Sequence, residues 1–552
     1  MSESLANAYD ESSAAADVSA VPVLGSRLPP DLAGRLFDLV VVGGGITGAG
    51  IARHAAQAGL TVLLLEAEDF AAGTSSRSTK LIHGGLRYLA MGDIALVREG
   101  ALERKSVGRM APHLTEPRWM LVPARSIFEY AKLRIGIGLY ERLGAVSGDD
   151  RQRNWDRAQM ARLEPLLDSK RLAWVCAYRE FLTDDTRLVL ATLRAAVRDG
   201  ATTCSHARVT SIDQDADGAR LQVTDGRDGS VHEVRGRAVV NAAGPWVEGL
   251  LRDSAQDAAA PPPVKLHLSK GVHLAVDHDR LPVRNMVMMT ASDGRPVFAI
   301  PRGQVTYIGT TDTTYEGDPT VWPEVEAADI AYLLAAANEH FNLPPLTGDD
   351  VLSTWAGLRP LIHQAGKAPK EMSRRDEIWR DRRMISIAGG KLTGFRKMAE
   401  EAMAAVAEVL DCDTAMSAPL APLPGGDIDD LDGLRRDVAT RYQQDSQAAA
   451  RLVRLYGSEV FAVLGEQPRP LSDSVFAEEV DWAVRVEGAE TLEDLIYRRL
   501  RAAWFLPREV EGLLQPCAAL MTKLLGWSDG RRADEVERVR ALMADELAFR
   551  NG

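Results

Sequence analysis

Residues 74–93, TSSRSTKLIHGGLRYLAMGD, bring anion-binding and proton-accepting side chains into one short span. Hydroxyl side chains come first, and Lys80, His83, Arg87 and Tyr88 follow, with a glycine pair at 84–85. Guanidinium groups bind phosphate and carboxylate in a bidentate way. The stretch shows neither a helical stripe nor strict alternation, so we expect it to line a ligand instead of filling a core. The residues alone assign His83 no role.

A glycine-rich turn precedes this stretch and identifies the class of ligand. Gly43, Gly45 and Gly48 form G-x-G-x-x-G between an expected strand at 37–42 and an expected helix at 46–58. Such a turn lets a pyrophosphate approach the backbone at the positive end of a helix. A second expected strand at 60–65 ends at Glu66, where a carboxylate accepts hydrogen bonds from a ribose. The unit predicts a dinucleotide site, and both NAD and FAD fit it.

Two later segments repeat the pattern of a strand followed by small residues. VVNAAGPW at 239–246 ends an apolar strand with residues that allow close approach of a ligand. AGGKLTGFRK at 388–397 places two glycines before a helix whose first amides could meet an anion or an electron-rich ring edge. Lys391 in this segment is either a surface charge or a cation of the site.

The composition excludes several classes of function. The formal net charge of −13 over 552 residues argues against broad nucleic-acid binding. Four scattered cysteines without CxxC indicate a reducing compartment without structural zinc. DQDADGARLQVT at 213–224 begins like a calcium loop but has Thr224 in the place of the final glutamate, so a hairpin turn is expected. The sequence has no apolar run of about 18 residues, so no membrane-spanning helix is expected.

The segment 126–144 leaves two interpretations open. It mixes aromatic, aliphatic and basic residues, which suits either a helix at a lipid surface or a core helix with a basic edge.

The order of the expected elements predicts an α/β protein with three parts. We expect a disordered tail at 1–35 and a discontinuous dinucleotide-binding domain at 36–260 and 380–415, with a β-meander at 207–240. A mixed-sheet substrate domain is expected at 261–379 together with part of 110–180, and a helical C-terminal domain at 420–552.

Several of these segments together resemble one family, the FAD-dependent glycerol-3-phosphate dehydrogenases. The resemblance rests on DLVVVGGGITGAGIA (38–52), TSSRSTKLIHGGLRYL (74–89), MAPHL (110–114), NAAGPW (241–246), KGVHLAV (270–276), IGTTD (308–312), GLRPL (357–361) and GGKLTGFRK (389–397). The first of these motifs is shared with other flavoprotein oxidases, whereas the second and seventh are more specific. No calcium-binding loop, as in some relatives, occurs after residue 400.

The resemblance implies a Rossmann-like FAD-binding domain of the glycine-oxidase and glutathione-reductase type, with non-covalent FAD. It implies oxidation of sn-glycerol 3-phosphate to dihydroxyacetone phosphate, by hydride transfer from C2 to flavin N5, in glycerol and glycerophospholipid catabolism. Electrons would pass to a membrane quinone, either menaquinone or ubiquinone. The enzyme would be cytoplasmic, in peripheral contact with the inner leaflet of the cytoplasmic membrane, and homodimeric, with no metal or nucleic acid. The alternatives are an oxidase that reduces O₂ to H₂O₂ and a non-catalytic flavin-binding protein.

The resemblance also implies roles for individual residues. His273 is favoured as general base, and Arg359 would polarise the reacting oxygen, since a guanidinium stays protonated. Arg87, Tyr88, Arg375 and Lys391 would bind substrate, with Arg374 the neighbour that could replace Arg375. The expected FAD-binding residues are Gly43, Gly44, Gly45, Thr47, Gly48, Glu66, Ala67, Thr74, Ser75, Ser76, Ser78, Lys80, Leu81, Ile82, Ala207, Val209, Ala243, Gly244, Gly390, Lys391, Leu392 and Thr393.

Overall fold

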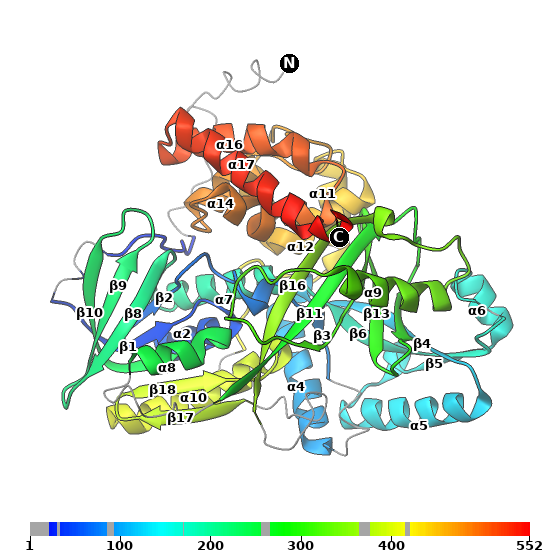
Figure 1. Ribbon diagram of the computed structural model, residues 1–552, viewed down its shortest axis with the longest axis horizontal. Coiled ribbons are helices and arrows are strands. Elements are labelled where there is room, and N and C mark those ends of the chain that lie inside the picture. The colour runs from blue at the N-terminus through cyan, green and yellow to red at the C-terminus, as the bar shows by residue number, and fades with distance from the viewer. Residues whose placement is uncertain are drawn as a thin grey trace.

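Two sheets and a cap of helices make up the protein (Figure 1). The computed structural model describes residues 21–29, 32, 34–84, 93–168, 170–254, 265–363, 376–413 and 420–551. The expected tail at 1–35 therefore falls largely outside the described residues.

The first sheet carries the glycine-rich unit. Its parallel core is β18–β10–β1–β2–β7, and β17 pairs with β18 in the antiparallel sense. Strands β8 and β9 join β10 as an antiparallel meander. The bounds are β1 (Leu36–Val42), β2 (Val62–Leu65), β7 (Thr202–Cys204), β8 (Ala207–Gln214), β9 (Ala219–Asp225), β10 (Val231–Asn241), β17 (Glu377–Asp381) and β18 (Met384–Ala388).

Both faces of this sheet are covered, as the continuous apolar runs of its strands require. Helices α2 (Ile46–Gln57), α7 (Asp185–Arg198) and α10 (Phe395–Leu410) pack together against one face. The meander and α8 (Val247–Asp253) pack on the other. The strands and helix expected at 37–65 are confirmed, and so is the hairpin expected near 213–224, which turns at Asp215 and Gly218.

The second sheet draws its strands from two separate stretches of the chain. Its order is β15–β11–β14–β13–β12–β4–β6–β3, with β16 paired to β11 and β5 paired to β6. The bounds are β3 (Leu81–Ile82), β4 (Glu116–Ala124), β5 (Arg153–Trp155), β6 (Trp174–Leu182), β11 (Leu266–Asp277), β12 (Met286–Thr290), β13 (Pro296–Arg302), β14 (Val305–Gly309), β15 (Thr313–Thr314) and β16 (Val351–Ile362). This mixed sheet contains the expected site segments KGVHLAV on β11 and GLRPL on β16.

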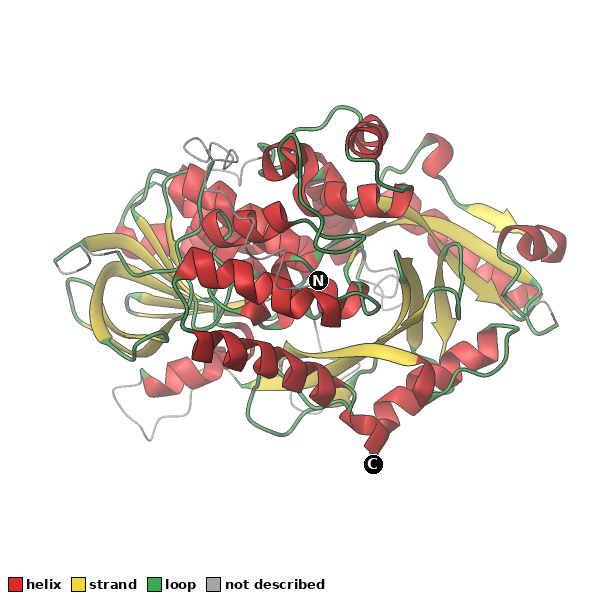
Figure 2. Cartoon of the chain, turned by 90° about the horizontal axis from the view of Figure 1, so that it is seen from above, coloured by secondary structure: helices red, strands yellow, loops and turns green. Residues whose placement is uncertain are grey.

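Helices flank the second sheet and cap the molecule (Figures 1 and 2). Beside the sheet lie α4 (Ile94–Met110), α5 (Ile127–Leu143), α6 (Arg157–Leu163) and α9 (Ala327–His340). The C-terminal helices are α11 (Leu431–Arg441), α12 (Ser446–Tyr456), α13 (Val460–Leu464), α14 (Ala477–Arg485), α15 (Ala502–Phe505), α16 (Val510–Leu525) and α17 (Asp529–Glu546), with a π-helical turn at Asp494–Arg499. The predicted fold class, α/β with a mixed second sheet and a helical C-terminal region, is confirmed.

Candidate functional site

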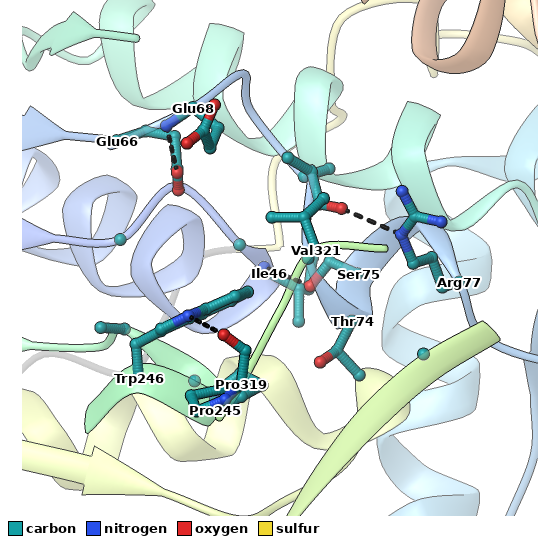
Figure 3. A pocket seen from close by; sticks show the side chains of 18 of the residues that line it. Ile46, Glu66, Glu68, Thr74, Ser75, Arg77, Pro245, Trp246, Pro319 and Val321 are labelled. Carbon is teal, nitrogen blue, oxygen red and sulfur yellow. Dashed lines mark hydrogen bonds between the residues drawn. The ribbon is translucent and has the colours of Figure 1, made fainter. Parts of the chain in front are cut away.

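A cavity of about 1410 Å³ lies beyond the carboxyl ends of β1, β2 and β10 and reaches the second sheet. Pockets for single small molecules usually measure roughly 300–1,000 Å³. This cavity therefore has room for an extended dinucleotide together with a small substrate. Its wall includes the glycine-rich turn, residues 73–80 except Ser76, the Ala243–Gly244 turn and residues 389–393. Figure 3 shows part of this wall, including Ile46, Thr74 and Ser75.

The glycine-rich turn has the geometry that phosphate binding needs. Gly43 has φ +112°, and a side chain there would place Cβ 2.5 Å from the Ala242 carbonyl oxygen. Gly45 directly precedes α2 and lines the cavity with Ile46 and Thr47, so the positive amino end of the helix borders the cavity. The Ile46 amide donates to Ser75 Oγ at 3.0 Å, which ties the hydroxyl-rich loop to this turn (Figure 3).

Glu66 lies on the wall at the end of β2 and is held by backbone amides. Its Oε2 accepts from the Gly44 amide at 2.6 Å. Its Oε1 accepts from the Glu68 amide at 2.9 Å (Figure 3). Burial raises the pKa of this carboxyl, although both amides favour its charged form. These two hydrogen bonds from backbone amides fix the carboxylate at the place where the adenosine ribose of a bound dinucleotide is expected.

The hydroxyl-rich loop uses only part of its side chains on the cavity. Thr74, Ser75 and Ser78 line it, and Thr74 Oγ1 also donates to the Leu358 carbonyl at 2.6 Å. Lys80 contributes to the wall, but its ammonium group is fully buried and donates to Asp185 at 3.1 Å and to the Ser76 carbonyl at 2.8 Å. Burial lowers the pKa of Lys80 to about 7. The ammonium therefore fixes the loop from behind instead of pointing at a ligand.

Four predicted cofactor residues do not line the cavity and take supporting positions behind its wall. Gly44 and Gly48 support the turn: a Cβ at Gly48 would lie 1.9 Å from the Gly43 carbonyl oxygen. Ser76 is buried with its hydroxyl near the Gly73 carbonyl, and Ile82 packs in the core. The other described cofactor residues line it: Gly43, Gly45, Thr47, Glu66, Ala67, Thr74, Ser75, Ser78, Lys80, Leu81, Ala207, Val209, Ala243, Gly244, Gly390, Lys391, Leu392 and Thr393.

The two predicted catalytic residues occupy different layers. Arg359 on β16 lines the cavity, and its Nη2 donates to Thr310 Oγ1 at 2.9 Å. His273 on β11 does not line it: the residue is 1 % exposed, and its ring stacks on Trp355 with centroids 5.0 Å apart. Its Nε2 lies 2.9 Å from Oγ1 of Thr79, a residue of the cavity wall, and its Nδ1 is buried with no hydrogen-bond partner among the described residues. His273 thus reaches the cavity through the Thr79 hydroxyl.

The protonation state of His273 follows from its surroundings. Burial, followed by the charges of Lys80 and Arg359, holds its pKa well below the ordinary value of an imidazole. The imidazole is therefore neutral near pH 7 and can accept a proton, but it is a weaker base than an exposed histidine.

Glycines make space for both side chains. A Cβ on Gly271 would lie 2.2 Å from the Arg359 guanidinium, and a Cβ on Gly309 would lie 2.0 Å from the His273 ring. These two positions on neighbouring strands therefore require glycine if Arg359 and His273 are to keep their places.

The far end of the cavity is formed by residues 389–393. Gly389 and Gly390 have φ +84° and +77°, which brings Lys391 and Leu392 onto the wall before a short 3₁₀ turn leads into α10. Thr393 Oγ1 donates to the His83 carbonyl at 3.2 Å and lies 3.1 Å from the His83 amide. His83 is therefore placed on the wall at this end. Arg87, Tyr88 and Arg375 lie outside the described residues.

Several wall residues are not among the residues predicted to bind FAD or substrate. Arg77 lies under Trp322 with its guanidinium 3.9 Å from the ring centre, and Trp246 Nε1 donates to the Pro319 carbonyl at 3.0 Å across the two sheets (Figure 3). The C-terminal region adds a group at one end: Glu490, Thr491, Glu493, Asp494, Arg498, Arg531, Glu535 and Arg538. Arg77 and Trp246 lie within the quoted motifs at 74–89 and 241–246, whereas Trp322 and the C-terminal group lie in none of the motifs.

Comparison with known proteins agrees with this geometry. Residues 38–425 match the family described as FAD dependent oxidoreductase, and residues 418–532 match the C-terminal domain of alpha-glycerophosphate oxidase. The aerobic glycerol-3-phosphate dehydrogenase of Staphylococcus haemolyticus (strain JCSC1435) is 35% identical over 531 residues, covering 91% of this chain and 93% of that protein. That of Staphylococcus aureus (strain USA300) is 36% identical over 527 residues, with the same coverage of each chain.

The chain belongs to the FAD-dependent glycerol-3-phosphate dehydrogenase family.

Solved structures support membership of this family. The glycerol-3-phosphate dehydrogenase from Bacillus halodurans, complexed with FAD, aligns with a TM-score of 0.74 at 34% identity, over 94% of this chain and 97% of that one. L-alpha-glycerophosphate oxidase from Mycoplasma pneumoniae aligns with a TM-score of 0.53 at 18% identity, over 68% of this chain and 95% of that one, which shows the shared fold. FAD is therefore the dinucleotide that the turn, Glu66 and the size of the cavity fit.

Proposed function

We propose that the protein oxidises sn-glycerol 3-phosphate to dihydroxyacetone phosphate and passes the electrons to a membrane quinone, in glycerol and glycerophospholipid catabolism. The observation that carries the proposal is the pairing of Arg359 with the Thr79–His273 hydrogen bond at one cofactor cavity. FAD, when bound, supplies the acceptor for the hydride that leaves C2. The names of the relatives at 35–36% identity supply the substrate class.

The reacting hydroxyl needs an electrophile and a proton acceptor. Arg359 has the charge to polarise the hydroxyl oxygen on C2 of the substrate and to stabilise the alkoxide that develops there. Asp312 Oδ1 lies 3.5 Å from Arg359 Nη1 and helps to orient the guanidinium. The proton would pass to Thr79 Oγ1 and from there to Nε2 of the neutral His273. A hydroxyl can accept and donate at once, so this relay needs no movement of the buried ring.

The phosphate dianion needs several cations at one end of the substrate. Lys391 lies on the wall, and we extend the substrate-binding role to Arg87, Tyr88 and Arg375 on the strength of the family motifs. His83 is a second candidate for the base, since it also lies on the wall beside residues 391–393.

Membrane contact is proposed through α5. Its exposed residues include Ile127, Phe128, Ile135 and Leu139, of which Phe128 is 80% exposed. Lys132, Arg134 and Arg142 are exposed on the same helix, whereas its two acids, Glu129 and Glu141, are not. Apolar side chains beside bases suit an interfacial helix that meets anionic headgroups. This supports peripheral contact, and the helix lies at the lower edge of the molecule in Figure 1.

No helix within the described ranges has the length and hydropathy needed to cross a bilayer. Attachment to the cytoplasmic leaflet by α5 would bring a bound flavin near a lipid-dissolved acceptor. A cytoplasmic homodimer completes the proposal, and sedimentation would test the oligomeric state.

The acceptor is tested with the reduced enzyme. Purified protein is treated anaerobically with glycerol 3-phosphate, which should bleach the flavin absorbance. The bleached enzyme is then mixed with a soluble quinone analogue or with air-saturated buffer. Fast reoxidation by the quinone supports the dehydrogenase, and fast reoxidation by O₂ alone supports the oxidase. Absence of bleaching would instead support the non-catalytic flavin-binding protein.

Membrane contact is tested by sedimentation with vesicles of phosphatidylglycerol and phosphatidylcholine. Phe128→Glu should release the protein from the vesicles, because it places a charge at the most exposed apolar position of α5. Val231→Glu is the control, since Val231 is 63% exposed on β10, away from α5. Equal binding of both variants would reject α5 as the contact.

A further inference from the structure

The end of the cavity beside Glu66 is closed by the C-terminal helical domain. In a Rossmann-like unit the acid that ends the second strand marks the adenosine half of the dinucleotide. Glu66 therefore orients the cavity, with the adenosine end here and the flavin end near residues 389–393. The wall at the Glu66 end continues through Glu68, Asp69 and His206 into residues 490–498.

Buried ion pairs hold the two parts together at this place. Asp69, four residues after β2, is fully buried and accepts from Arg499 at 2.6 and 2.8 Å. Arg498 also donates to Asp69 and reaches Glu493 at 2.9 Å and Asp494 at 2.7 Å. Removing either partner of such pairs leaves an uncompensated buried charge, so the helical domain is firmly seated against the loop that follows β2.

A second connection runs from β8, the strand that carries the predicted FAD-binding residues Ala207 and Val209. His206 precedes Ala207, and its amide donates to the Glu68 carbonyl at 2.8 Å, while the Ala207 amide donates to the Glu66 carbonyl at 2.8 Å. The His206 ring lies 3.2 Å from Asp494 Oδ2, which also accepts from the amides of Glu490 and Thr491 at 2.9 Å. Asp494 thereby fixes the 490–494 turn against His206 on the cavity wall.

Helix α17 adds charges to the same end. Arg531, Glu535 and Arg538 line the cavity and follow one another at helical spacing on one face. Arg538 donates to Glu493 at 2.9 Å, and Glu493 in turn accepts from Arg498, which connects α17 to Asp69. The match to the FAD dependent oxidoreductase family ends at residue 425, so residues 490–498 and the three α17 residues lie outside the part of the chain that this family match covers.

We propose that the C-terminal helical domain forms part of the adenosine subsite for FAD, through residues 490–498 and the α17 face of Arg531, Glu535 and Arg538. FAD binding and seating of this domain are therefore linked: the cofactor binds the seated form, and its occupancy stabilises the contact between the domain and the loop after β2. The proposal rests on FAD as cofactor and not on the substrate or the electron acceptor.

Two charge reversals on α17 form a matched pair for the test. Arg538 and Arg540 each make an ion pair with a glutamate of the same domain, Glu493 and Glu511, and their side chains are 57% and 41% exposed. Of the two, only Arg538 lines the cavity. With the full-length chain freed of FAD, titration with FAD and detection by flavin fluorescence should give a Kd about tenfold higher for Arg538→Glu, because the change replaces a positive charge by a negative one at the adenosine end of a cavity that binds an anionic cofactor.

Arg540→Glu should change the same Kd less than about twofold. Equal FAD affinity in the two variants would overturn the proposal. A second measurement needs no variant: hydrogen exchange of the wild-type chain with FAD, and separately with ADP. Both ligands should slow exchange of the amides of 490–499, and FAD alone should also slow those of 389–394. Protection at 43–48 without any protection at 490–499 would overturn the proposal. Neither readout depends on turnover, so failure here is distinct from failure of the proposed reaction.

Discussion

Gly271→Ala is expected to abolish most activity by moving one guanidinium. Gly271 lies on β11 opposite Gly357, and the Arg359 side chain fills the space over it. The new Cβ would start 2.2 Å from Arg359 Nη2, 2.6 Å from Cζ and 2.7 Å from Nη1. Relief of this overlap needs a shift of about 1 Å, which the flexible arginine can make more easily than the paired strand.

The size of the effect follows from that shift. The hydrogen bond from Nη2 to Thr310 Oγ1 is 2.9 Å long, and a displacement of about 1 Å breaks it. A misplacement of this size costs about 10²-fold in rate, or about 2.7 kcal/mol in activation free energy. Stability should change little, because the strand pairing is kept and the overlap involves the end of a side chain.

Anaerobic stopped-flow measurement of flavin reduction by glycerol 3-phosphate is the assay. FAD content is measured in the same preparation, because Gly271 lines the cavity and loss of cofactor would imitate loss of chemistry. Gly512→Ala is the control, since Gly512 lies in helix α16 and a Cβ there meets no atom of the described ranges within 4 Å. A normal rate of flavin reduction in Gly271→Ala with full FAD content would refute the role given to Arg359.

Three further outcomes are expected. His273→Ala should slow flavin reduction about 10²–10⁴-fold if this imidazole is the general base, and a near-normal rate would reject that role in favour of His83. Thr79→Val should slow flavin reduction about 10²-fold. The same change leaves the buried Nε2 of His273 unpaired and should lower the free energy of unfolding by about 1–3 kcal/mol. Slow flavin reduction in His273→Ala together with a normal rate in Thr79→Val would reject the relay. The third concerns His206: burial disfavours its charged form, but Asp494 more than offsets this and raises its pKa to about 9. The folded state thus binds the proton more tightly, so the contribution of about 3 kcal/mol is complete below pH 6.5 and is lost as the pH rises towards 9. His206→Gln should remove this loss from denaturant titrations at pH 6 and pH 9, and an unchanged pH dependence would show that the pair does not stabilise the fold.

Much of the FAD-binding domain was predictable because its signals are local. A buried strand, a glycine turn and a helix within residues 36–66 leave few alternatives, since a parallel strand covered on both faces must be apolar throughout and Gly43 must take a positive φ. The loop at 74–80 was assigned to a ligand for the same reason, as its pattern fits no core. The roles of single side chains in it were harder to predict, because Lys80 and Ser76 turn inward to Asp185 and to backbone carbonyls.

The catalytic layer was only partly predictable. Arg359 and Lys391 come from segments far apart in the chain, and their place on one wall depends on the register of β16 against β11 and on the turn after β18. His273 illustrates the limit: its strand was found, but strand alternation cannot tell whether a ring meets a cavity or stacks on Trp355 behind Thr79.

The sequence by itself determined the class of cofactor, the family and the course of the first sheet, because glycines, strand runs and an acid at fixed spacing act within one supersecondary unit. Tertiary structure alone decided which side chains border the cavity. It placed the Thr79 hydroxyl between His273 and the site, and it brought the C-terminal helices onto the adenosine end through Asp69, Arg498 and Arg499. Residues that are more than 400 positions apart in the sequence, such as Asp69 and Arg499, show no local pattern that would reveal their contact. The contact depends on how the C-terminal helices and the loop after β2 pair their buried charges.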